Sequence, residues 1–276
     1  MPQEGDAAVP ASRASTPDER PHSQPSLPIT AIVDARQSRA VERSAAGLHK
    51  RGLVSLKGLD DRESVARFTA QIMTVQRQRS DGPDGLTSLT HPAQFGSRST
   101  ERIASSGLAP RTAGSALVHP PGLLLLACLR APAQGGHVRL VDGKKLYIYM
   151  TQRCPAAAAV FSAASAGFFG GSGGVTAPAF CRRGDGRVSL RLAPDSAVRW
   201  CAEAKTHLPQ LQDALARNEI TVKLQAGEGL LVDNLRWASG RTTSVGPYQF
   251  MRALGFPHDN RPTGVLPTQP APGGTA

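Results

Sequence analysis

The chain has 276 residues, of which 40% are hydrophobic and 19% are charged. This composition predicts one large folded domain, or two small ones, with a substantial core, and the longest apolar run, at 122–129, is too short to cross a bilayer. The formal net charge of +11 raises nucleic acid as a partner. Because the basic residues are scattered and no zinc-finger or aromatic RNA-binding motif accompanies them, nucleic-acid binding is not expected.

The two ends of the chain differ in composition from its middle. Residues 1–28 and 258–276 are rich in Pro and in small or polar residues, and they have few large apolar side chains. Such segments bury too little apolar surface to offset the entropy lost on ordering, so we predict disordered tails around a folded domain at 29–257. No apolar signal segment precedes this domain and the four cysteines lack metal-site spacing, so we expect a cytoplasmic protein with reduced thiols.

Within the domain, the pattern of apolar residues changes along the chain from helical to strand-like. Helical spacing covers 34–52 and 60–76 on either side of a strand at 53–59, and a further helix is predicted at 202–216. Short strands separated by Gly, Pro and Asp turns are predicted at 85–90, 122–130, 136–141, 187–192, 219–224, 229–233 and 248–254. Helices that flank many short strands are typical of a mainly β fold, a β-sandwich or jelly roll with helices packed outside.

The histidines give little indication of a metal site. None of the seven stands in a His-x-Asp, His-x-Glu or His-Glu-x-x-His pattern. A site that recruits the scattered His91, His119 and His137 is the alternative that the sequence leaves open.

Four sequence segments are weak signals singly and specific in combination. In chain order they are "PPGLLLL", "GGHVRLVDG", "GEGLLVDN" and "GRTTSVGP…MRALG". On these segments the chain resembles, between about residues 45 and 256, the taurine dioxygenase/clavaminate synthase-like (TauD/TfdA) family of iron(II)- and 2-oxoglutarate-dependent oxygenases. The resemblance implies a double-stranded β-helix, which is a jelly roll, with helices packed around it.

The resemblance also locates the family's iron ligands, two histidines and one carboxylate. The matching positions here hold Arg111, Ala113 and Ser239. A guanidinium has no lone pair to donate and carries a permanent charge, which at ligand distance would repel the metal by several kcal/mol even at an effective dielectric constant of about 20. We therefore predict a metal-free relative of the family that uses no cofactor.

The co-substrate positions implied by the resemblance have changed as well. Val138 stands where the family commonly has a threonine that contacts 2-oxoglutarate, and Tyr248 stands where it commonly has an arginine. Arg241 and Arg252 match family arginines. Arginine binds carboxylates and phosphates through two parallel hydrogen bonds, so these two residues are candidates for holding an anion.

From these substitutions we expect a pocket that binds, or converts without metal, a small anionic molecule, in specialised metabolism by analogy with the family. The candidate binding residues are Arg111, Asn234, Ser239, Arg241 and Arg252, and Tyr248 is a candidate proton donor. Three alternatives remain. Arg111 turns into solvent and the pocket is filled; the chain is an active iron(II)/2-oxoglutarate oxygenase that hydroxylates an amino acid-like molecule at a histidine site; or it is a non-catalytic partner of another protein.

Overall fold

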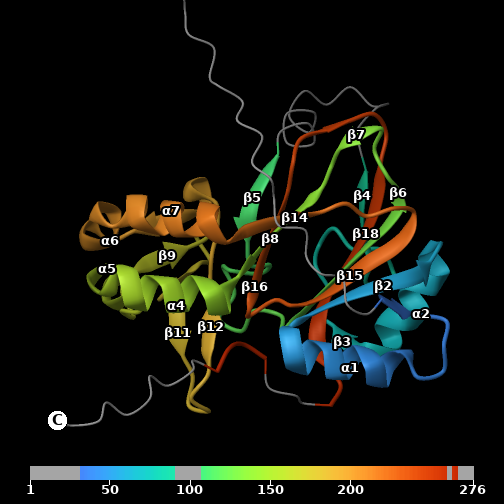
Figure 1. Cartoon of the computed structure of the whole chain (residues 1–276), viewed down its shortest axis with the longest axis horizontal. Helices are drawn as coiled ribbons and strands as arrows, with labels where there is room; N and C mark the ends of the chain where they lie inside the picture. Colours follow the sequence, from blue (N-terminus) through green and yellow to red (C-terminus); the bar gives the residue numbers. More distant parts are fainter. Residues whose placement is uncertain (1–31, 91–106, 260–262, 267–276) are drawn as a thin grey trace, which may run out of the picture.

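The computed structural model describes residues 32–90, 107–259 and 263–266 (Figure 1). The predicted N-terminal tail lies outside these residues, as does most of the predicted C-terminal tail. Residues 263–266 pack on the domain, because Val265 exchanges two backbone hydrogen bonds with Val188, of 2.7 and 2.9 Å, and is buried. The prediction of a disordered tail from residue 258 is therefore wrong for these four residues.

The architecture is a jelly roll in which a seven-stranded sheet faces a four-stranded sheet (Figure 1). The larger sheet contains, in spatial order, β1 (Ile32–Asp34), β2 (Leu53–Leu59), β15 (Gly227–Asp233), β6 (Leu123–Arg130), β18 (Gln249–Pro257) and β3 (Met73–Val75), with β4 (Thr87–Thr90) also paired to β18. The smaller sheet contains β14 (Glu219–Val222), β8 (Val138–Asp142), β16 (Trp237–Arg241) and β5 (Leu108–Arg111). This confirms the predicted mainly β, jelly-roll fold.

A hydrophobic core fills the space between the two sheets. Its members come from alternate positions of the strands, because successive side chains of a strand point to opposite faces. The larger sheet contributes Leu124, Leu230, Val232, Phe250 and Leu254, and the smaller sheet contributes Val138, Leu140, Val222 and Trp237. These residues define the inner face of each strand, which is the face that the candidate site uses.

Helices cover the outer faces of both sheets (Figure 1). The larger sheet packs against α1 (Ala40–Arg51) and α2 (Arg62–Ile72), and the smaller sheet lies beside α4 (Gly143–Arg153), α5 (Pro155–Phe161), α6 (Ala202–Thr206) and α7 (Leu208–Asn218). The α1 helix ends at Gly52, whose φ of 66° suits a residue without a side chain. At the start of α2, the Asp61 carboxylate accepts a 2.7 Å hydrogen bond from the Ser64 N–H. None of the described helices has the length and apolar character of a membrane-spanning helix.

Short strands beside α4–α7 complete the domain. They are β9 (Gly167–Phe169), β10 (Val175–Ala177), β11 (Phe180–Arg182), β12 (Val188–Leu190) and β13 (Val198–Trp200), with a 3₁₀ turn at Asp195–Ala197 and a small pair of β7 (Gln134–Gly135) and β17 (Ser244–Val245). The pair β11–β12 is the hairpin whose second strand was predicted at 187–192. Its turn contains Gly186 with a φ of 76°, a value that glycine adopts without strain.

Candidate anion site

Arg111 and Ser239 lie next to each other on the smaller sheet. Ser239 is the direct cross-strand neighbour of Arg111 on β5 and of Leu140 on β8. Leu140 belongs to the core between the sheets, and side chains that lie opposite each other on paired strands share a face. The structure therefore brings together two of the three residues that the family resemblance places at the iron-ligand positions, on the inner face.

Arg252 approaches the same space from the larger sheet. Phe250 and Leu254, two residues before and after it on β18, both belong to the core between the sheets, so the pleat directs Arg252 inward as well. Burial lowers the pKa of both guanidiniums, and the positive charge of Arg111 further lowers the pKa of Arg252. Two partly buried positive charges therefore lie close enough to repel each other.

Among the residues that the structure describes, few groups compensate these two charges. The Arg252 guanidinium donates one 3.2 Å hydrogen bond to the Thr87 hydroxyl, while its buried Nε has no acceptor. The negative charge of Asp81 raises the pKa of Arg252 and so partly compensates its charge. No hydrogen bond or ion pair joins the Arg111 guanidinium to the part of the chain that the structure describes. A buried charge without a partner is costly, so both guanidiniums have the capacity to bind an anion.

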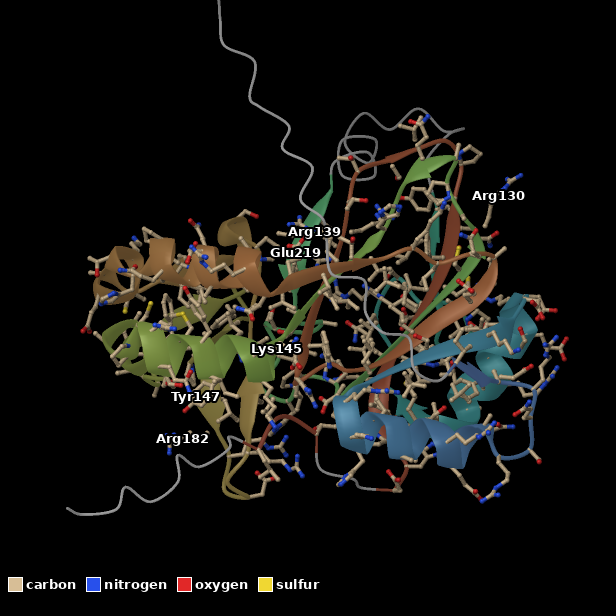
Figure 2. All side chains as sticks on the ribbon, in the orientation of Figure 1. Arg130, Arg139, Lys145, Tyr147, Arg182 and Glu219 are labelled. Atoms are coloured by element: carbon tan, nitrogen blue, oxygen red, sulfur yellow. The ribbon has the colours of Figure 1, made fainter. Side chains whose placement is uncertain are left out.

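Arg139, on the outer face of the same sheet, differs from Arg111 in having a carboxylate partner. Arg139 lies between the inward-facing Val138 and Leu140 on β8 and therefore points outward. Its guanidinium donates two 2.7 Å hydrogen bonds to the two carboxylate oxygens of Glu219. Figure 2 shows this pair side by side where β8 and β14 meet. On the outer face the arginine therefore has a carboxylate partner, whereas no carboxylate of the described residues pairs with Arg111 on the inner face.

Arg241 and Tyr248 contact each other. The Arg241 guanidinium carbon lies 4.5 Å from the centre of the Tyr248 ring, a cation–π contact. Tyr248 is buried, and its ring also contacts the edge of Phe250, with 5.9 Å between ring centres. Val138, at the family's threonine position, lies opposite Arg241 on β8 and is buried in the core. The role of Tyr248 as a proton donor stays a prediction.

Asn234 fixes the loop that follows Arg111. It is completely buried, and its amide oxygen accepts a 2.8 Å hydrogen bond from the Ala113 N–H. Its amide nitrogen donates to the carbonyl oxygens of Ala113 and Pro121, at 2.9 and 2.8 Å. These three bonds go to the backbone of the loop, so we interpret Asn234 as a residue that positions the loop next to Arg111.

A second loop-fixing residue, Arg191, was not identified from the sequence. Its guanidinium donates to the carbonyl oxygens of Ser115 and Leu117, the latter at 2.8 Å. It also lies over the Phe169 ring at 5.7 Å. These partners are more than twenty residues away in the sequence, so no local spacing points to them.

The residues at the expected iron-ligand positions do not fit the metal. They present a guanidinium, a methyl group and a hydroxyl, whereas ferrous iron in such sites takes two imidazoles and a carboxylate. Across residues 32–90, 107–259 and 263–266, no three His, Cys, Asp or Glu side chains are grouped to hold a metal ion. His119 is exposed, His137 is half-buried, and His91 lies outside the described residues.

Asp233, which precedes Asn234, is a carboxylate whose ionisation opposes folding. It is buried, and this burial raises its pKa to about 6. An unfolded aspartate titrates near pH 3.9, so the folded state binds the proton more tightly and the protein loses stability as the pH rises from about 4 to about 6. The free energy of unfolding of the wild type should fall by about 2–3 kcal/mol across this window, and we expect Asp233→Asn to lack this fall. Urea unfolding at successive pH values measures both.

The matched control for this titration is Asp60→Asn, which removes an exposed carboxylate. The pH dependence of Asp233→Asn is compared with that of this variant as well as with that of the wild type. If the pH dependence of Asp233→Asn equals that of the wild type, Asp233 does not titrate in the folded protein in this range.

Comparison with known proteins identifies the family. The model of the taurine catabolism dioxygenase TauD, TfdA family matches residues 16–253. The chain belongs to this family. The resemblance found on the four sequence segments is thereby confirmed. No curated protein sequence matches the chain significantly.

Solved structures of several oxygenases share the fold. A taurine dioxygenase from Burkholderia xenovorans superimposes with a TM-score of 0.61 at 18% identity, covering 83% of this chain and 88% of that one. The non-heme iron oxygenase OrfP, in complex with Fe, succinate and (3S)-hydroxy-L-Arg, gives a TM-score of 0.61 at 13% identity over 78% and 79% of the two chains. An asparagine oxygenase bound to Fe(II), 2S,3S-3-hydroxyasparagine and succinate gives 0.57 at 15% identity over 80% and 85%.

Proposed function

We propose that this TauD/TfdA-family chain binds a small carboxylate-bearing metabolite between Arg111 and Arg252, without a metal ion. The observation that carries the proposal is the pair of inward-facing, partly buried guanidiniums that repel each other, with the buried Nε of Arg252 lacking an acceptor among the described residues. A bound carboxylate would lie between the two positive charges and accept hydrogen bonds from both. Its negative charge would replace the repulsion by two attractions.

Neighbouring side chains offer contacts to parts of the ligand other than its carboxylate. The Ser239 hydroxyl lies beside Arg111 and offers a neutral donor or acceptor. Tyr248, with Arg241 over its ring, provides an aromatic surface and a phenol. If the chain also converts its ligand, we propose Tyr248 as the group that delivers or removes a proton. By analogy with the family, we propose that the metabolite belongs to specialised metabolism, and the sequence favours a cytoplasmic protein.

The test is a thermal unfolding screen with mono- and dicarboxylates, with chloride of equal ionic strength as reference. A ligand that binds only the folded state, at 100 times its Kd, adds about 2.7 kcal/mol, or about 5–10 °C in Tm for a domain of this size. We expect such a shift for the wild type and none for Arg111→Gln. Without ligand, Arg111→Gln should unfold at the same temperature as the wild type or higher, because one of two repelling charges is gone.

The matched control is Arg130→Gln, which removes the same charge from an exposed position at the end of β6, where Figure 2 shows the side chain pointing outward. This variant is expected to keep the ligand response. If no carboxylate shifts the Tm of the wild type, or if Arg111→Gln responds as the wild type does, the proposal is wrong. The first result, with intact folding, would favour the non-catalytic partner protein.

Iron binding and 2-oxoglutarate turnover distinguish the alternative, an active oxygenase, from the metal-free proposal. Iron retained in stoichiometric amount through a chelator wash, together with succinate released from 2-oxoglutarate, would overturn the metal-free proposal. A metal site would then have to include residues outside the described ranges, such as His91. We expect the washed protein to hold no stoichiometric iron and to release no succinate.

A further inference from the structure

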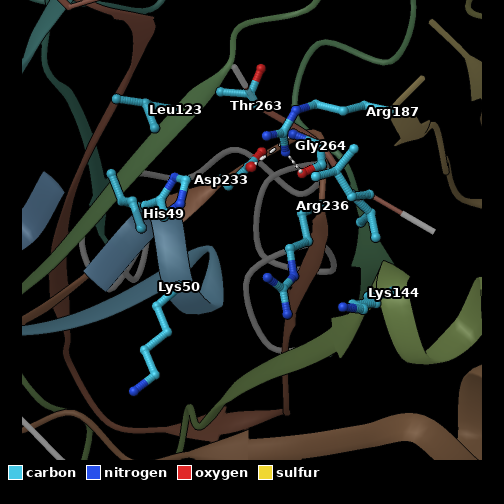
Figure 3. Close-up of a pocket in the computed structure, with 12 residues that line it drawn as sticks. His49, Lys50, Leu123, Lys144, Arg187, Asp233, Arg236, Thr263 and Gly264 are labelled. Atoms are coloured by element: carbon cyan, nitrogen blue, oxygen red, sulfur yellow. Dashed lines mark hydrogen bonds between the residues drawn. The ribbon is translucent and has the colours of Figure 1, made fainter. Parts of the chain in front are cut away.

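A second set of cations lines a cavity away from the two inner arginines. The cavity has a volume of about 160 Å³ (Figure 3). It is lined by residues of six separate parts of the chain: Leu48, His49, Lys50, Leu123, Lys144, Arg187, Asp233, Arg236, Thr263, Gly264, Val265 and Leu266. None of the residues proposed to bind the carboxylate lines it, so the cavity is a distinct site.

The balance of charge around this cavity is positive. Arg236 is neutralised by Asp142, whose two carboxylate oxygens accept hydrogen bonds of 2.9 and 2.8 Å from its guanidinium. Within the described chain, no hydrogen bond or ion pair engages the ammonium groups of Lys50 and Lys144. Lys144 is half-buried in the first turn of α4, and Lys50 is exposed at the end of α1.

Arg187 is a confined cation whose charge the described residues compensate only weakly. Only 16% of its side chain is exposed, yet its guanidinium donates a single 3.3 Å hydrogen bond, to the Gly264 carbonyl oxygen. Its nearest carboxylate, Asp185, is 3.9 Å away and 40% exposed. A guanidinium has five N–H donors, so most of those of Arg187 have no acceptor in the described structure.

The one acidic side chain that lines the cavity is directed at the backbone. Asp233 accepts a 3.0 Å hydrogen bond from the Leu235 N–H on one carboxylate oxygen and a 2.8 Å bond from the Gly264 N–H on the other. Its carboxylate therefore holds the segment 263–266 in place and forms no ion pair with Arg187 or Lys144. The donors of these two cations remain available to a ligand.

We propose that this cavity binds a phosphate group, through Arg187 and Lys144, with Lys50 and the remaining N–H groups of Arg236 at its edge. Arg187 reaches the cavity from the turn before β12, Lys144 from the start of α4 and Arg236 from the loop before β16, so their donors approach a ligand from different elements (Figure 3). A tetrahedral oxyanion offers oxygen atoms in all these directions, whereas a carboxylate offers two in one plane.

The experiment measures binding by isothermal titration calorimetry at constant ionic strength. The probes are inorganic phosphate and a phosphomonoester, glycerol 3-phosphate. We expect both Lys144→Gln and Arg187→Gln to weaken binding by about tenfold or more, since each removes a charge-assisted hydrogen bond of about 1.4 kcal/mol or more. Tighter binding of the phosphomonoester would identify the phosphate of a larger molecule as the ligand, and tighter binding of phosphate would identify the free ion.

Two variants serve as controls. Lys145→Gln removes the same charge from the next residue of α4, which is exposed, and is expected to weaken binding by less than about threefold. Arg111→Gln tests the other anion site and should leave phosphate binding unchanged. The proposal is overturned if the wild type does not bind either probe, if Lys144→Gln and Lys145→Gln weaken binding equally, or if only Arg111→Gln abolishes it.

Discussion

Replacing Asn234 by alanine is expected to destabilise the protein by about 3 kcal/mol or more. The substitution removes three hydrogen bonds and leaves the Ala113 N–H and the Ala113 and Pro121 carbonyl oxygens without their partner. Because the Asn234 side chain is completely buried, water does not take its place without opening the structure. Urea unfolding measures the change, and hydrogen exchange at the Ala113 amide should accelerate even under conditions in which the protein is folded.

The control for this prediction is another Asn→Ala substitution. Asn218, in the last turn of α7, donates one 2.8 Å hydrogen bond to the Ala214 carbonyl oxygen and is only partly buried. Its replacement is expected to cost about 1 kcal/mol or less. Equal losses at the two positions would show that Asn234 does not fix the loop after Arg111.

Breaking the ion pair of Asp142 and Arg236 is expected to destabilise the protein as much as Asn234→Ala does, or more. Asp142→Asn removes the negative charge, while the asparagine still supplies an oxygen for the Lys144 N–H at the start of α4. The Arg236 side chain is only 14% exposed, and a confined charge that loses its partner typically costs about 3–5 kcal/mol. The free energy of unfolding at neutral pH, measured with urea, checks this value.

The comparison variant is Glu219→Gln, which breaks the ion pair with Arg139. The two pairs have similar geometry, but Arg139 is 31% exposed, so water solvates the remaining guanidinium and the expected cost is about 1 kcal/mol or less. Asp142→Asn combined with Arg236→Gln should recover part of the loss, because it removes the uncompensated charge. A cost of Asp142→Asn no greater than that of Glu219→Gln would contradict the prediction.

Much of the fold was predictable because its strands carry local signals. The strand at 53–59 was predicted with the bounds that the structure shows, and the strands at 122–130 and 229–233 were placed within about two residues. The helix α4 was not predicted from the sequence. In the structure the Asp142 carboxylate caps the helix and the Gly143 N–H donates to the Arg236 carbonyl oxygen. That contact spans the chain, so no local pattern indicates it.

By itself, the sequence determined the family, the jelly-roll fold and the types of side chain at the expected ligand positions. It did so because strand periodicity, turn residues and the four segments are local in the chain. Only the tertiary structure decided that Ser239 lies beside Arg111, that Asn234 holds the loop, and that Arg187 and Lys144 line one cavity. The balance of charge, burial and hydrogen bonding around a side chain depends on residues far away in the sequence, and these meet only when the two sheets close on each other.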